Sequence, residues 1–358
     1  MPSANCSLLT ANFYLYKMFF LTGIIISTFL TALLLFKRPK SHADLILTAW
    51  MALMTVHQVL AYLHYAGITQ EYPHLLGVIM PWPLLHGPFL FLYVTAMTRE
   101  KSLKWPEILP HFIPFVILYM LAIPFFMLSA AEKTEVFNNK GAGYEWYNLT
   151  QQAMIIIIGL GYIFWCLVRI HRHRTKIKQW FSNTDKITLR WLEYLSIGLG
   201  IIWLLVLFFD DHIVFSGVVL LVIFIGMFGI TQLPVFYAHR EILETTQHPD
   251  PPSFDEFVPP AEDTEGDVVR YAKSGLKEPE STDLHQRLTK MMEEKALYKQ
   301  NDITLADLAA LLDTHPNYLS QVINEKEGKN FYNYINSLRV QAFIQASSQP
   351  DKKHYSLL

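Results

Sequence analysis

The sequence predicts an all-α protein in three parts: a seven-helix transmembrane bundle over residues 1–240, a linker over residues 241–281, and a small helical helix-turn-helix domain over residues 282–358. Long apolar stretches fill the chain up to about residue 233, and 52% of its 358 residues are hydrophobic. The rest of the chain is polar and charged. This shift in composition is typical of a membrane part joined to a water-soluble part.

Seven apolar segments approach or reach the length of a membrane span, since a bilayer core of about 30 Å needs roughly 20 helical residues. Their approximate bounds are 18–36, 45–65, 75–97, 112–131, 153–168, 191–209 and 213–233. Only Asp210, Asp211 and His212 separate the last two. The sequence therefore predicts seven successive crossings, with a tight hairpin between the sixth and the seventh.

Basic residues gather on one side of these predicted spans. Lys and Arg follow the first and third spans and surround the connection between the fifth and the sixth, whereas the opposite loops carry only Lys133 and Lys140. Loops rich in Lys and Arg stay in the cytoplasm. The pattern predicts an N-terminus outside the membrane and a C-terminal domain in the cytoplasm, and it also favours attraction of the basic loops to anionic lipid.

The segment from Thr245 to Asp283 is rich in proline and acidic residues and has little helical periodicity. Such a composition is typical of an extended, flexible spacer. We therefore expect a linker between the membrane part and the C-terminal domain.

Two short helices joined by a tight turn are predicted in ITLADLAALLDTHPNYLSQVIN, residues 303–324. Thr304 and Asp307 form a T-x-x-D capping pattern at the start of the first helix. Pro316 suits the first turn of the second helix, where its missing N–H group has no cost. The break at residues 313–315 supplies the turn between the two.

The second of these helices has an apolar side and a polar side. Its polar residues are expected on the outer face, and they are Asn317, Ser320, Gln321 and Asn324. Asn and Gln each offer a donor and an acceptor together, the pairing that adenine presents in the major groove. An ordinary solvated face of a small helical domain explains the same residue types equally well.

From about Arg270 to the end, the tail closely resembles the DNA-binding domain of AraC/XylS-type transcription regulators, through ITLADLAALLDTHPNYLSQVINEKEGKNFYNYINSLRVQAF, residues 303–343. RYAKSGL, residues 270–276, and the layout of the chain resemble the membrane-anchored subgroup of Bacteroidetes-type bacteria, with a weaker similarity in HGPFLFLYV, residues 86–94. The resemblance implies a regulator that binds promoter DNA sequence-specifically from the inner (cytoplasmic) membrane of a bacterium.

The resemblance also implies roles for particular residues. Asn317, Ser320 and Gln321 match the base-facing positions, and Arg339 matches the arginine of a helix that connects to a second helix-turn-helix. With the flanking candidates included, the expected DNA-contacting set is Asn317, Tyr318, Ser320, Gln321, Asn324, Lys329, Asn330 and Arg339. The sequence stops at HYSLL, where the second helix-turn-helix is expected to begin, so half of the expected base contacts are missing.

The charge of the tail bears on how tightly it binds DNA. From residue 281 onward nine Lys and Arg residues balance nine Asp and Glu residues, so the formal charge is 9 − 9 = 0. Neutralisation of phosphates supplies most non-specific affinity for DNA. We therefore expect weak, salt-sensitive binding by one chain, which a homodimer or a second helix-turn-helix would strengthen.

Polar residues inside predicted spans are candidates for sensing a small-molecule or membrane signal, because burying them in lipid is unfavourable unless they are paired. The candidates are His57, His64, Trp82 and His86 in the second and third spans, and Asp210, Asp211 and His212 at the outer surface. Hydrogen bonds that merely join helices are the simpler interpretation for the histidines, and a short hydrophilic turn is the simpler one for the outer group.

The sequence predicts no enzyme, no cofactor and no metal site. It contains no HExxH, P-loop, GxSxG or glycine-rich dinucleotide motif, and its only cysteines are Cys6 and Cys166. The sequence is thus interpreted as a membrane-embedded one-component transcriptional regulator. A membrane receptor whose helical tail docks a protein partner is the main alternative, and a seven-span transporter or heme-binding enzyme is another.

Overall fold

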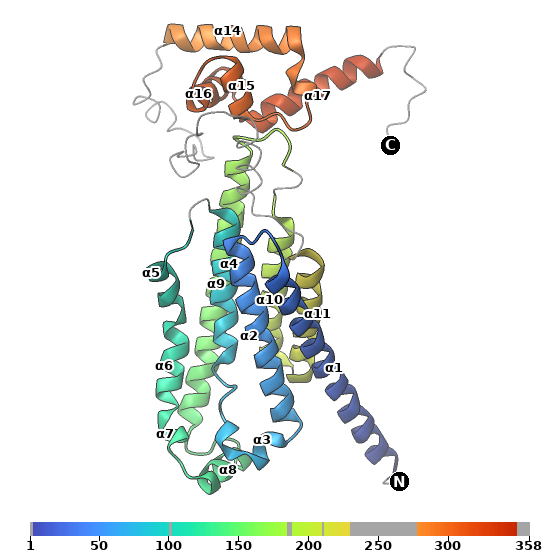
Figure 1. The fold of residues 1–358 in the computed structure, drawn as a ribbon, viewed down its shortest axis with the longest axis vertical. Coiled ribbons are helices and arrows are strands. Elements are labelled where there is room, and N and C mark those ends of the chain that lie inside the picture. The colour runs from blue at the N-terminus through green and yellow to red at the C-terminus, as the bar shows by residue number, and fades with distance from the viewer. Residues whose placement is uncertain (1–2, 100–101, 185–187, 210, 230–277, 349–358) are drawn as a thin grey trace. The chain divides into compact units, whose positions relative to one another are not determined.

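The computed structural model describes residues 3–99, 102–184, 188–209, 211–229 and 278–348. Within these residues the protein consists of helices, turns and loops, and it forms no strand (Figure 1). The predicted all-helical class is confirmed. Most of the predicted linker lies outside the described residues.

The chain divides into two units. The first unit contains Met1–Ile170 and Arg190–Thr245, and the second contains His171–Leu189 and Thr246–Leu358. The chain therefore passes from one unit to the other at three points. Sequence boundaries alone place residues 171–189 in the membrane part, but the structure groups them with the C-terminal helices.

The first unit is a bundle of helices (Figure 1). Within it α1 packs against α2 and α11, α10 packs against α11, and α2 packs against α4. Its main helices are α1 (Ser3–Phe36), α2 (His42–Tyr65), α4 (His86–Thr98), α6 (Ile113–Leu121), α9 (Glu145–Ile177), α10 (Arg190–Phe208) and α11 (Asp211–Phe228). The short helices are α3 (Ile68–Glu71), α5 (Trp105–Ile108), α7 (Ile123–Phe126) and α8 (Ala130–Asn138). Of α9, the residues up to Ile170 belong to this unit.

Four helices among the described residues are long and apolar enough to cross a membrane, judged by length and composition. They are Met18–Phe36, His42–Tyr65, Glu145–Ile177 and Arg190–Phe208. Trp105–Leu121 and Ile213–Phe228 are apolar but shorter. The first, second, fifth and sixth predicted spans thus coincide with helices of sufficient length.

The third and fourth predicted spans are not single long helices. In the third, α4 begins only at His86 and follows a 3-10 helix at Trp82–Leu85. In the fourth, α6 ends at Leu121 and α7 starts anew at Ile123. Proline explains both breaks, because it lacks the N–H group that a helix interior needs and fits best in a first turn. Pro83 and Pro124 each occupy such a position.

Close packing of α1 depends on Gly23. A Cβ atom at this position would lie 1.8 Å from the Gln58 side-chain oxygen in α2 and 2.8 Å from a Val219 methyl carbon in α11. Neither distance is compatible with real atoms. Small residues of this kind let helices approach closely in membranes, where association depends on packing rather than on the hydrophobic effect.

Besides the end of α9, the second unit contains four α-helices among its described residues: α14 (Glu278–Lys295), α15 (Leu305–Leu311), α16 (Pro316–Glu327) and α17 (Phe331–Ser347). A 3-10 helix at Leu297–Lys299 follows α14. Helix α16 packs against each of the other three. Their shared core is apolar and includes Leu284, Leu288, Leu308, Leu319, Val322, Ile323 and Ile335. Helix α14 begins at Glu278, three residues before residue 281, where the linker was expected to end.

Candidate functional site

The start of α15 is fixed by a reciprocal cap, as the sequence predicts. The Asp307 backbone N–H donates to Thr304 Oγ1 over 3.2 Å, and the Thr304 backbone N–H donates to an Asp307 carboxylate oxygen over 2.9 Å. These bonds satisfy amide groups that have no partner within the helix. The cap thus sets where α15 begins.

A short turn, Leu312 to His315, leads from α15 into α16. Asp313 adopts a left-handed backbone conformation with φ of 50°, which Asp tolerates better than most residues. His315 then caps α16 by accepting a hydrogen bond from the Asn317 backbone N–H at Nδ1. Pro316 occupies the first turn, as expected, and Gly328 ends the helix with φ of 63°. Local chemistry therefore defines both ends of α16.

The polar face of α16 is less accessible than the sequence suggests. Ser320 is 4% exposed and Gln321 is 7% exposed, although both were expected on the outer face. The Gln321 amide donates to the Glu325 carboxylate over 2.9 Å, one turn further along. Helical periodicity gives the side of the helix on which a residue lies, but not how far that side is covered. Ser320 is thus buried, and Gln321 is buried and hydrogen-bonded within the protein.

The other three residues of α16 in the expected DNA-contacting set differ from one another. Asn317 has a buried side-chain oxygen without a hydrogen-bond partner among the described residues. Tyr318 is exposed, with its ring centroid 6.0 Å from that of His315. Asn324 is partly exposed and accepts the capping hydrogen bond of the Gly328 backbone N–H with its carbonyl oxygen. Asn317 therefore has an unused acceptor at the N-terminal end of α16.

Two of the three flanking candidates for contact with the DNA backbone, Lys329 and Asn330, lie between α16 and α17. The Lys329 ammonium donates to the Ser337 hydroxyl over 3.2 Å. Asn330 caps α17, because its side-chain oxygen accepts from the Asn333 backbone N–H over 2.9 Å. Both side chains are partly exposed. Asn330 therefore has a structural role in starting α17.

Arg339 is surrounded by acceptors from the protein itself. Its guanidinium donates six hydrogen bonds, which matches the five N–H groups of arginine with one shared. The acceptors are the carbonyl oxygens of Ser182, Tyr298, Gln300 and Asn301, the Ser182 hydroxyl and the Asn336 side-chain oxygen. Burial lowers the pKa of this guanidinium, and the nearby Asp302 carboxylate opposes that shift. The donors of Arg339 are thus occupied in joining segments of the second unit, not free for phosphate.

The Ser182 acceptors belong to residues 178–184, a segment that directly follows α9. We call this segment the docked loop. The Trp180 carbonyl accepts from the Leu305 backbone N–H over 2.8 Å, and the Lys178 carbonyl accepts from the Tyr332 backbone N–H over 2.9 Å. Phe181 and Thr304 form an antiparallel bridge. The docked loop is therefore held on α15 and α17 by backbone hydrogen bonds.

Ser182 is the centre of this contact. It is fully buried, its hydroxyl donates to the Ile303 carbonyl over 2.7 Å, and its own carbonyl accepts from the Asn336 amide over 3.1 Å. Reasoning from the sequence missed the contact, because the basic residues around it suggested only a cytoplasmic loop. The uncharged stretch QWFSNT, residues 179–184, is the signal that could have revealed it.

Among the candidate sensing residues, His57 and His86 lie together inside the bundle. His57 Nδ1 is 2.9 Å from His86 Nε2, and the Trp50 indole N–H donates to His86 Nδ1 over 3.2 Å. A neutral imidazole has one donor and one acceptor nitrogen. Since His86 Nδ1 accepts, its Nε2 must carry the hydrogen and donate to His57. The result is a directed chain from Trp50 through His86 to His57.

Trp82 lies beside this chain, and His64 lies elsewhere. The Trp82 ring centroid is 6.0 Å from that of His57, and its N–H donates to the Tyr119 hydroxyl over 3.0 Å. His64 packs edge-on against Phe137, with 5.5 Å between ring centroids. The structure thus joins three of the four predicted histidine and tryptophan candidates.

The predicted outer group is only partly described. Asp210 lies outside the described residues, and Asp211 and His212 are the first two residues of α11. In the part of the chain that the structure describes, no group of three or more His, Cys, Asp or Glu side chains is arranged to hold a metal ion.

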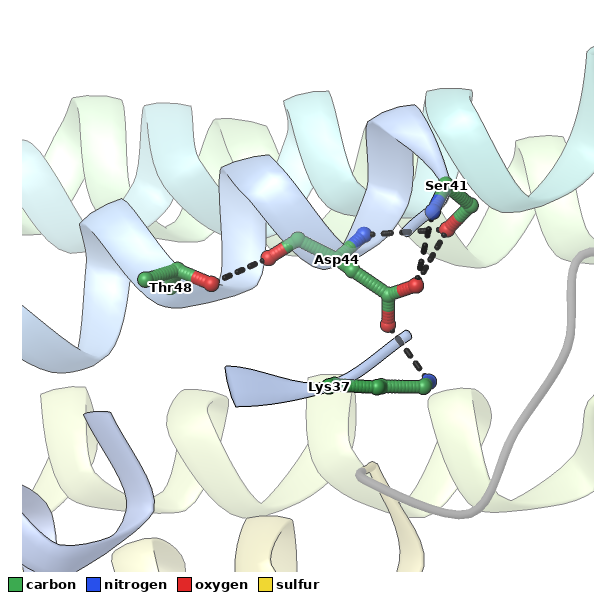
Figure 2. Close-up of polar contacts among 4 residues, drawn as sticks. All are labelled: Lys37, Ser41, Asp44 and Thr48. Carbon is green, nitrogen blue, oxygen red and sulfur yellow. Dashed lines mark hydrogen bonds and ion pairs between the residues drawn. The ribbon is translucent and has the colours of Figure 1, made fainter. Parts of the chain in front are cut away.

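A second polar cluster, which the sequence did not suggest, lies where α1 leads into α2 (Figure 2). The Asp44 side chain is 5% exposed, and its carboxylate lies 2.6 Å from the Lys37 ammonium. It also accepts from the Ser41 backbone N–H over 2.9 Å and from the Ser41 hydroxyl over 2.8 Å. The Asp44 carbonyl accepts from the Thr48 hydroxyl. Asp44 thus combines a helix cap with a nearly buried ion pair.

Replacing Asp44 by asparagine is expected to destabilise the first unit by about 2 kcal/mol, because the Lys37 ammonium loses its ion pair with a nearly buried carboxylate. Thermal unfolding of the detergent-solubilised protein measures the change. Glu132→Gln is the matched control, since Glu132 occupies the same position in the capping box of α8 but is exposed. Equal effects of the two substitutions would show that the ion pair adds nothing to the cap.

No family model matches this chain, and no curated protein or solved structure was found to be similar to it.

Proposed function

We propose that this chain is a membrane-embedded one-component transcriptional regulator whose second unit binds promoter DNA through α15 and α16. The observation that carries the proposal is the capped pair of short helices joined by a turn from Leu312 to His315. A helix-turn-helix is built in this way, and its second helix enters the major groove. Asn317, Ser320, Gln321 and Asn324 would supply the side chains that contact bases.

The proposal includes a topology with seven crossings. The four long apolar helices account for four of them, and α4, the helical segments from Trp105 to Phe126, and α11 would complete the set. The concentration of Lys and Arg in the loops supports an N-terminus outside and a second unit in the cytoplasm. The resemblance of the tail to bacterial regulators supports a location at the inner membrane of a bacterium. In that location the second unit shares a compartment with DNA.

The docked loop supports a route from signal to DNA. A signal shifts the equilibrium between two states only if it favours one of them. Helix α9 is continuous to Ile177, and the docked loop that follows it binds residues 303–305 and α17. A change in the bundle that moves the end of α9 would therefore alter the segment that starts α15.

The engaged state of Gln321 is part of the proposed mechanism. Its amide donates to Glu325 in this structure, so pairing with adenine requires that the amide exchange this partner for a base. The neutral charge of the tail gives one copy little non-specific affinity. Two copies bound to paired half-sites would supply the additional contacts.

DNA binding is tested with the purified full-length protein in lipid nanodiscs, by selecting preferred sequences from a random DNA pool. Asn317→Ala and Gln321→Ala are each expected to weaken binding to the selected site about tenfold, since a bidentate base contact discriminates by roughly 1–3 kcal/mol. Asn333→Ala is the matched control, because Asn333 is exposed on α17. A wild-type protein that selects no sequence would contradict the proposal.

A second candidate function is a receptor whose tail docks a protein partner. The observation that favours it is an apolar strip on α17, formed by Val340, Phe343 and Ile344, each more than half exposed. Residues at this spacing share one helix face. If Phe343→Asp abolishes signalling in cells while the selection experiment yields no preferred DNA sequence, this candidate replaces the first.

A further inference from the structure

The first unit contains a cavity of about 170 Å³ that no predicted site residue lines. Its wall is formed by α7, α8, the start of α9 and the turn around Gly77. Five aromatic side chains line it: Phe125, Phe126, Phe137, Tyr144 and Tyr147. Aliphatic groups such as Met80 and Val136 complete most of the surface. The cavity is thus largely apolar and rich in aromatic rings.

Two glycines fix the shape of this cavity. Gly77 has φ of 81°, and a Cβ atom there would lie 2.8 Å from a ring carbon of Phe125. Gly141 has φ of 83°, and a Cβ atom there would lie 2.5 Å from the Asn148 amide nitrogen. Other residues are strained in this backbone conformation and would also collide with the lining. Gly77 therefore brings the backbone close to Phe125, and Gly141 brings it close to Asn148.

One polar group in the lining has no partner. Tyr147 is 5% exposed, and its hydroxyl is buried without a hydrogen bond among the described residues. A buried hydroxyl usually has a hydrogen-bond partner, because removing it from water is otherwise unfavourable. The neighbouring Tyr144 is only partly buried and contacts Phe125 edge-on. Tyr147 therefore supplies the lining with a buried hydroxyl whose hydrogen-bonding capacity is unmet.

We propose that this cavity binds a small, uncharged aromatic molecule that carries a hydrogen-bond acceptor, and that Tyr147 donates to that acceptor. The volume fits a single ring with a small substituent, since apolar cavities of about 150 Å³ hold benzene. Aromatic side chains favour an aromatic guest through edge-to-face and offset contacts. Lys140 also lines the cavity, but it is exposed to solvent. An ionic guest is disfavoured, because the rest of the wall is largely apolar and does not replace the water around the charge of the guest. Binding at this site does not depend on the proposed regulatory function.

The cavity adjoins two of the predicted sensing residues. Phe137, in its lining, packs edge-on against His64. Phe126, also in its lining, stacks on Tyr119 with 6.0 Å between ring centroids and an interplanar angle of 20°. Tyr119 accepts from Trp82 and donates to the Val78 carbonyl. A guest would therefore touch side chains that lead to His64 and Trp82.

The test measures binding of benzaldehyde, which has a ring and an acceptor, and of toluene, which has a ring alone, to the full-length protein in nanodiscs by calorimetry. The wild type is expected to bind benzaldehyde more tightly than toluene. Tyr147→Phe should reduce benzaldehyde affinity about five- to tenfold and leave toluene unchanged, because it removes one hydrogen bond and no ring. Tyr144→Phe is the matched control in the same cavity and should change neither.

A second variant tests the location. Ala122 lines the cavity and is nearly buried, so Ala122→Leu should fill space and reduce affinity for both compounds at least tenfold. Equal affinity of the wild type and Tyr147→Phe for benzaldehyde would overturn the role of the hydroxyl. Absence of binding to the wild type, or full binding to a folded Ala122→Leu protein, would overturn the site.

Discussion

Replacing Arg339 by alanine is expected to destabilise the second unit by about 3 kcal/mol. The substitution removes the hydrogen bonds that the Arg339 guanidinium donates to the carbonyl oxygens of Ser182, Gln300 and Asn301. Hydrogen bonds to a charged group are each worth more than neutral ones, and the buried Ser182 carbonyl would keep only the Asn336 amide as a donor. Arg339→Lys should recover only part of the loss, because an ammonium cannot reproduce the planar fork of donors.

Hydrogen exchange in the full-length protein measures this effect at single amides. The Leu305 amide, which donates to the Trp180 carbonyl, should exchange roughly a hundredfold faster in Arg339→Ala, as about 3 kcal/mol implies. Lys290→Ala is the control, since Lys290 is exposed on α14. If exchange at Leu305 stays the same, Arg339 does not hold the docked loop in place.

Replacing His86 by alanine is expected to destabilise the first unit by about 2–4 kcal/mol. The Trp50 indole N–H and His57 Nδ1 would both lose their partner, and a cavity would remain where the ring had been. His57→Ala should have roughly half this effect, because the bond from Trp50 to His86 survives. His86→Ala is expected to have the larger effect, because His86 lies between Trp50 and His57 in the series of hydrogen bonds.

Thermal unfolding in detergent, followed by near-ultraviolet circular dichroism of the tryptophans, measures both variants. His42→Ala serves as the control, because His42 is exposed at the start of α2. A His57→Ala protein as unstable as His86→Ala would show that the bond from Trp50 contributes nothing measurable.

Features set by local chemistry could be predicted from the sequence. The cap formed by Thr304 and Asp307, the position of Pro316 and the four long apolar helices all depend on residues within a few positions of one another. The sequence did not predict where proline interrupts a helix. Hydropathy does not register such a break, so the segments around Pro83 and Pro124 were interpreted as continuous spans.

Contacts between distant segments could not be predicted. Ser182 and Arg339 are 157 positions apart, and no periodic pattern links them. The similarity of the tail to a DNA-binding domain suggested that Arg339 faces DNA, whereas the carbonyl groups around it depend on how the loop after α9 folds. The cavity was also missed because it depends on contacts between distant segments. Its lining comes from separate segments between Gly77 and Asn148, and no sequence pattern links them.

The position of the docked loop has a consequence for processing by proteases. A cut anywhere between residues 230 and 277 would break the covalent connection between α14–α17 and the preceding chain. The docked loop lies before such a cut, and it would still bind the C-terminal fragment through hydrogen bonds. The severed piece would therefore be retained rather than set free to diffuse. Its release would require a second event that breaks the hydrogen bonds of Ser182 with Ile303 and of Trp180 with Leu305.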